Sequence, residues 1–138
     1  MKKRENPYLV QEWTVLQNQY DSYEKFSLLI KLISIIIFSS TILFAKPSIL
    51  LLIIIAILWL QDAIWKTFQA RIEPRLLEIE FQLVEEESAV ACQFNLQYSK
   101  NKVGTMGMIK EYLSQAVRPT IAYPYVVLIG FGLILVLL

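Results

Sequence analysis

The hydrophobic residues of this chain form long blocks between polar segments, and they do not alternate with polar residues as they do around a globular core. Ser27 to Ala45 is apolar apart from Lys31 and the hydroxyl side chains at positions 39 to 41. As a helix this block is about 28 Å long, close to the ~30 Å hydrocarbon core of a bilayer. The pattern therefore predicts a first transmembrane span.

A second span is predicted from Ile49 to Leu60, after a short polar loop at positions 46–48. It runs into Gln61-Asp62, and Trp59 and Trp65 lie where an interfacial aromatic belt is expected. Because this block is short, we expect tilt or local thinning of the bilayer around it.

The third block, Thr120 to Leu138, carries no charged side chain and follows Arg118-Pro119. Tyr123 and Tyr125 near its start are typical of residues at the membrane interface. We expect Gly130 and Gly132 to let another helix approach closely. The chain therefore has three predicted spans.

The distribution of basic residues predicts the orientation. Of the 13 lysines and arginines, only Lys46 lies in the loop between the first two spans. The positive-inside rule then places the N-terminus and all soluble segments in the cytoplasm, and the C-terminus on the periplasmic or extracellular side. A cleaved signal peptide is disfavoured, because the polar segment at positions 1–26 is too long to precede its apolar region.

Apolar residues continue at helical spacing outside the first two spans, in a pattern typical of a packing seam. If the two helices form one antiparallel hairpin, residues that face each other have numbers that add up to about 93, and this register extends the hairpin as a cytoplasmic coiled coil. An aromatic box that stacks a ligand is the less favoured interpretation, since stripes at this spacing usually pack. The predicted seam consists of Leu9, Trp13, Leu16, Tyr20, Tyr23, Phe68, Ile72, Leu76, Ile79 and Leu83.

The same register places Lys31 level with Asp62, the one cation inside the first span and the acid at the end of the second. A charge in the membrane is costly, so the two side chains are predicted to form an ion pair near the cytoplasmic boundary. The alternative is that each extends separately to the lipid headgroups.

Pro74 is expected to kink or restart the second helix. A straight helix from Ala63 to Tyr98 would extend about 54 Å, whereas the returning segment, with a helix from Met106 to Arg118, reaches only about 45 Å. The helix must therefore bend, tilt or fold back, and the polar stretch at 99–104 is the expected connection.

These patterns predict an all-α integral membrane protein with four parts. Residues 1–26 form a cytoplasmic amphipathic helix, 27–65 a transmembrane hairpin, 66–118 cytoplasmic helices and 119–138 a C-terminal transmembrane helix.

The composition removes several kinds of chemistry. The chain has no histidine and a single cysteine, Cys92, so histidine-based catalysis, a Cys/His zinc site and an internal disulfide are excluded. Cys92 is interpreted as a small apolar residue in a helix. A net charge of +1 without a basic stripe gives no reason to expect nucleic acid. With no phosphate-binding loop or nucleophile motif, we expect no catalytic, cofactor or metal site.

An acidic stretch has no basic residue within it, and its role stays open. A solvated face is the favoured interpretation, and contact with a basic partner or repulsion from anionic headgroups are alternatives. It contains Glu78, Glu80, Glu85, Glu86 and Glu87.

The second span ends in a Trp-x-x-Asp-Ala pattern, Trp59, Asp62 and Ala63, followed by Trp65 and an arginine-bearing helix with Arg71. In this the chain resembles small bacterial membrane proteins of uncharacterised function, which implies the bacterial inner (plasma) membrane. The architecture is also similar to SLATT-like two-spanner effectors of bacterial nucleotide-signalling defence. That similarity implies membrane permeabilisation, but the third span departs from the two-span pattern.

The sequence supplies packing surfaces and no catalytic groups, which favours a non-enzymatic scaffold or accessory subunit. Its expected partners are the lipid bilayer and either further copies in a homo-oligomer or another membrane protein. The alternative is an oligomeric pore or membrane-disrupting effector, suggested by the hydroxyls of Ser39, Ser40 and Thr41.

Overall fold

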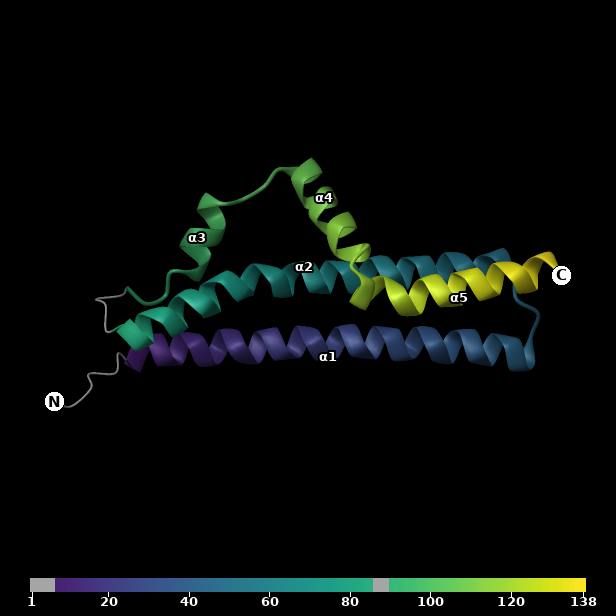
Figure 1. The fold of residues 1–138 in the computed structure, drawn as a ribbon, viewed down its shortest axis with the longest axis horizontal. Helices are drawn as coiled ribbons and strands as arrows, with labels where there is room; N and C mark the ends of the chain where they lie inside the picture. The colour runs from purple at the N-terminus through teal and green to yellow at the C-terminus, as the bar shows by residue number, and fades with distance from the viewer. Residues whose placement is uncertain (1–6, 86–89) are drawn as a thin grey trace.

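The computed structural model of the protein describes residues 7–85 and 90–138, and within these ranges every regular element is a helix (Figure 1). The helices are α1 (Pro7–Phe44), α2 (Ile49–Glu85), α3 (Phe94–Lys100), α4 (Thr105–Ala116) and α5 (Pro119–Leu137). The prediction of an all-α chain is thus confirmed. α1, α2 and α5 are each long and apolar enough to cross a membrane.

α1 and α2 lie side by side and antiparallel along nearly their whole length (Figure 1). The turn between them falls at positions 45–48, where Pro47 disfavours helical geometry in the residue before it. We call residues 7–26 of α1 and 66–85 of α2 the distal hairpin, because they lie farthest from this turn. The distal hairpin has its own apolar cluster, and a second cluster lies nearer the turn and includes Tyr125 of α5.

α5 packs against the part of α2 that is near the turn (Figure 1). The two glycines of α5 have different surroundings. A Cβ atom on Gly132 would lie 2.5 Å from Leu52 Cδ2 and 3.1 Å from Phe38 Cε2, so this glycine is where α5 approaches the hairpin closely. No atom lies within 4 Å of a Cβ on Gly130.

Of the two outcomes expected at Pro74, a kink or a restart of the second helix, the structure excludes the restart. α2 continues through Pro74 to Glu85, and Figure 1 shows its C-terminal part curving toward α1. Curvature is the usual response to a proline ring that crowds the preceding turn and removes one backbone donor. The chain folds back only after Glu85.

The returning chain arches over one side of α2 (Figure 1). We call residues 90–116, which contain α3, the connection 101–104 and α4, the arch. The connection is shorter than the predicted 99–104, because α3 extends to Lys100. Cys92 also corrects its interpretation as a small apolar helical residue. It is exposed, precedes α3 and has a φ of 62°, in the left-handed region that side chains other than glycine rarely adopt.

Candidate functional site

Three helices meet at the carboxylate of Asp62, which is fully buried. Ser27 of α1 donates a hydrogen bond to Asp62 Oδ1, and the Tyr125 hydroxyl of α5 donates to Oδ2 at 3.0 Å. Lys31 Nζ lies 3.5 Å from Asp62 Oδ2 and donates to Ser27 Oγ at 3.2 Å. We call these four residues the Asp62 cluster.

The Asp62 cluster gives both carboxylate oxygens a donor and places a cation beside them. A buried carboxylate without such partners would be strongly unfavourable. The structure thus brings together Lys31 and Asp62, the two residues predicted to pair. Sequence reasoning missed that Ser27 and Tyr125 complete the cluster. The hairpin register could have suggested Ser27, because it lies opposite the helical turn of α2 that follows Asp62. Nothing in the sequence around Tyr125 indicates that it contacts Asp62.

The two tyrosines near the start of α5 differ in exposure. Tyr125 is fully buried, whereas Tyr123 is 73% exposed. The Tyr125 ring stacks on Trp59, with centroids 6.1 Å apart. The Trp59 indole N–H donates to the Ala116 carbonyl at 3.0 Å, so Trp59 links α2 to the end of α4.

The predicted seam residues lie between α1 and α2 in the distal hairpin. Leu9, Leu16, Ile72, Leu76 and Ile79 are buried, and Trp13, Tyr20, Tyr23 and Leu83 pack against them. Phe68 contacts Tyr23, with ring centroids 6.3 Å apart. These side chains therefore form the apolar interior of the distal hairpin.

A buried ionic network closes the end of the distal hairpin. Arg75 of α2 donates two hydrogen bonds of 3.0 Å to Glu12 of α1 and lies 3.1 Å from Glu78. Its guanidinium also donates to the Val90 carbonyl at 3.3 Å, while the Cys92 N–H donates to Glu12 at 2.6 Å. The network thus joins both helices to the start of the arch.

Burial alone raises the pKa of the Glu12 carboxyl, but hydrogen bonds from Arg75 and from the Cys92 N–H outweigh it and hold that pKa below its ordinary value. Hydrogen bonds to Glu12, working against burial, raise the pKa of Arg75. Both groups are therefore charged near neutral pH, as a bidentate buried pair requires.

The acidic stretch is only partly a solvated face. Glu78 pairs with Arg75 and accepts a hydrogen bond from Gln97 at 2.8 Å, and Glu80 accepts one from the Trp13 indole at 2.9 Å. The remaining members lie outside the described residues, except for the backbone of Glu85.

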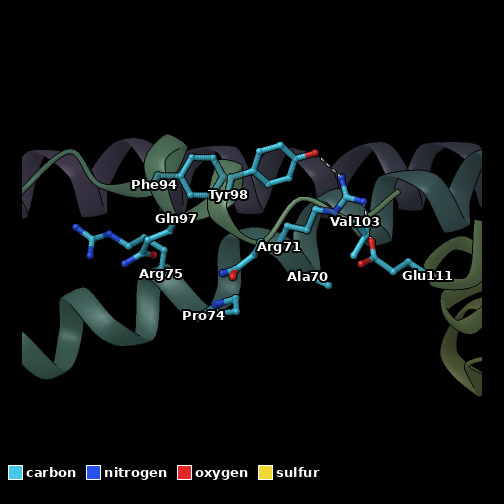
Figure 2. Close-up of a pocket in the computed structure, with 10 residues that line it drawn as sticks. Ala70, Arg71, Pro74, Arg75, Phe94, Gln97, Tyr98, Val103 and Glu111 are labelled. Atoms are coloured by element: carbon cyan, nitrogen blue, oxygen red, sulfur yellow. Dashed lines mark hydrogen bonds and ion pairs between the residues drawn. The ribbon is translucent and has the colours of Figure 1, made fainter. Parts of the chain in front are cut away.

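A cavity of about 270 Å³ lies between α2 and the arch (Figure 2). Figure 2 shows Arg71 reaching across it, with its guanidinium bonded to the Tyr98 hydroxyl at 3.0 Å and to Glu111 at 2.7 Å. Arg71 and Glu111 also line a neighbouring cavity of about 450 Å³. Both cavities share the Arg71–Glu111 ion pair. Arg71, the cation that an anionic ligand would need, is therefore already paired with a carboxylate.

Within residues 7–85 and 90–138, no three acidic or cysteine side chains gather closely enough to hold a metal ion. Of the three hydroxyl-bearing residues in the first apolar block, Thr41 donates a hydrogen bond to the Ile37 carbonyl of its own helix at 2.8 Å, and Ser39 and Ser40 are exposed. No protein-family model, curated protein or solved structure matches this chain.

Proposed function

We propose that the protein is a multi-pass inner-membrane scaffold or accessory subunit that acts without catalysis, through helix–helix assembly. In this proposal α1, α2 and α5 cross the bilayer, the distal hairpin and the arch are cytoplasmic, and the distal hairpin works as an antiparallel coiled coil. The positive-inside distribution of lysine and arginine supports this orientation.

Membrane insertion is supported by how little of the three apolar helices the fold itself covers. Only 17% of the most apolar window of α1 and of α5 is buried, and 28% of that of α2. Large aliphatic side chains such as Leu28, Ile36 and Leu50 stay exposed. Contiguous apolar surface of this extent is unfavourable in water and favourable in lipid.

The observation that carries the assembly proposal is an apolar stripe on α2 beyond the reach of lipid. Leu77, Phe81 and Val84 are 59%, 55% and 76% exposed, at spacings of four and three residues. We call them the distal stripe. At 1.5 Å per residue, Leu77 lies about 22 Å and Val84 about 33 Å beyond Asp62 along α2. Lipid cannot cover this stripe, so it suits an amphipathic helix of a second copy or of a partner subunit.

The surface that bears the distal stripe is held in place before binding. Arg75 lies on the same helix and joins α2 to Glu12 of α1 through its two hydrogen bonds. A preorganised helix surface loses less conformational entropy on association than a flexible one, which favours assembly.

Phe81→Glu tests this proposal, with Leu96→Glu as a matched control. The two side chains are 55% and 56% exposed, but Leu96 lies on α3 and is not part of the distal stripe. We expect the wild type and Leu96→Glu to form the same oligomer, or to carry the same stoichiometric partner, in lipid nanodiscs. Phe81→Glu should lose that assembly while keeping its helical content. A wild-type monomer that carries no partner would contradict the proposal.

An oligomeric pore is the second candidate, and the exposure of Ser39 and Ser40 favours it. Several copies could line a path with these hydroxyls, because three helices of one chain cannot enclose one. This candidate expects overexpression to depolarise the host membrane, and Ser39→Ala with Ser40→Ala to relieve that effect. Normal membrane potential at high expression would exclude it.

A further inference from the structure

A polar cavity of about 220 Å³ lies where four helices meet, between α1, α2, the end of α4 and the start of α5. We infer that this cavity binds the headgroup of a zwitterionic phospholipid bearing a primary ammonium group, of the phosphatidylethanolamine type. The inference rests on the membrane insertion proposed above.

The position of the cavity matches the headgroup layer. Lys66 and Gln69 line it, and they lie about 6 Å and about 10 Å beyond Asp62 along α2. The headgroup region adds roughly 5 to 8 Å to each side of the hydrocarbon core. Arg118, which precedes α5, lines the cavity as well, so the cavity opens at the cytoplasmic level where α5 enters the bilayer.

Gln115 supplies an unpaired side-chain amide to the cavity. Its side chain lines this cavity, is only 8% exposed and forms no hydrogen bond with the residues that the structure describes. A side-chain amide that faces a cavity and has no protein partner normally binds a ligand or water. The cavity is far larger than the ~30 Å³ that one water occupies.

The charges around the cavity select a zwitterion. Lys66 is already paired with Glu24 and donates to Gln69 at 2.9 Å, so these groups satisfy one another. Arg118 and Glu73 also line the cavity, and neither side chain forms an ion pair within residues 7–85 and 90–138. One free cation and one free carboxylate suit a phosphate and an ammonium on the same headgroup.

The start of α5 adds to the phosphate side of the cavity. α5 has 19 residues, Arg118 is its N-cap, and no side chain caps its first amides. Pro119 has no N–H and the Ile121 N–H donates to the Arg118 carbonyl, so within the described residues Thr120 has the one unbonded amide of this first turn. That amide and the positive end of the helix dipole favour an anion there, and Thr120 lines the cavity. We therefore assign the phosphate to Arg118 and Thr120, and the ammonium to Glu73.

The test is native mass spectrometry of the purified full chain with dioleoyl phosphatidylethanolamine, phosphatidylcholine or phosphatidylglycerol. The choline lipid has the same charges as the ethanolamine lipid but no N–H donors. The difference in retention between these two lipids therefore measures the hydrogen bond to Glu73. We expect the ethanolamine lipid to be retained about tenfold more than the choline lipid, as one charge-assisted hydrogen bond implies. Glu73→Gln should abolish this preference.

Two further variants test the phosphate assignment and the unpaired amide of Gln115. Arg118→Gln and Gln115→Leu should each lower retention of the ethanolamine lipid about tenfold. Lys25→Gln is the matched control, because it removes an exposed cation that does not line the cavity, and it should leave retention unchanged. Helical content and detergent stability identify any variant that misfolds.

Equal retention of the three lipids by the wild type would overturn the inference. A preference for the glycerol lipid that is insensitive to Glu73→Gln would overturn the ammonium assignment. Extraction of membranes with alkaline carbonate separates the two proposals: a chain released into solution refutes membrane insertion, whereas an inserted chain without lipid preference refutes only the cavity.

Discussion

Tyr125→Phe should weaken the attachment of α5 to the helical hairpin. The change removes one hydroxyl, which donates to Asp62 Oδ2 at 3.0 Å inside a fully buried site, and leaves the ring against Trp59. A hydrogen bond to a charged group contributes about 1.5 to 3 kcal/mol. Because the change removes little else, we expect a loss of about 2 kcal/mol in the free energy of unfolding.

Tyr123→Phe is the matched control, since Tyr123 lies two residues away on the same helix and is 73% exposed. A surface change of this kind should alter stability by less than about 0.5 kcal/mol. Reversible unfolding of the purified protein in mixed micelles, titrated with sodium dodecyl sulfate, measures both variants. If the two substitutions have equal effects, the Tyr125 hydroxyl does not bond to Asp62, and the reasoning that α5 is anchored there is wrong.

Two further predictions concern helix contact and acid stability. Gly132→Ala should destabilise the protein by about 1 kcal/mol relative to Gly130→Ala. Its Cβ would lie 2.5 Å from Leu52 Cδ2, the end of a side chain that must shift, while that of Gly130 meets nothing. The same micelle titration measures this difference, and equal effects would refute the close approach. Glu12→Gln should reduce the slope with which the free energy of unfolding falls as the pH is lowered. The pKa of Glu12 is depressed below 4.5 in the folded protein, so its contribution is present above about pH 4.5 and is lost as the pH falls through the folded pKa. Unfolding titrations between about pH 6 and pH 3 measure the slope, and an unchanged slope would argue against the Arg75 bond.

The hydrophobic pattern of the sequence is sufficient to predict the three long apolar helices, because an apolar block of the right length has few alternatives to a helix. Position along a helix axis is also fixed by sequence, at 1.5 Å per residue. For this reason the register of the hairpin places Lys31 level with Asp62 from their residue numbers alone. In the folded protein these two side chains lie 3.5 Å apart.

The faces through which the helices meet depend on packing between distant segments. Tyr123 and Tyr125 are the same residue type two positions apart, yet the rotation of α5 buries one and exposes the other. The same rotation makes Gly132, and not Gly130, the point of close approach. Periodicity carries no information about a partner from a distant segment, so the contact of Tyr125 with Asp62 could not be predicted.

The position at which the chain folds back also depends on tertiary packing. Local propensity points to Pro74, since proline interrupts a helix. α2 instead continues to Glu85, because packing of Ile79 and Leu83 against α1 and the bonds of Arg75 to Glu12 extend the hairpin beyond the proline. The hydrophobic pattern thus defines the long helices and which residues lie at the same height along the hairpin. Packing between distant segments determines which helix faces meet and which polar groups are buried together.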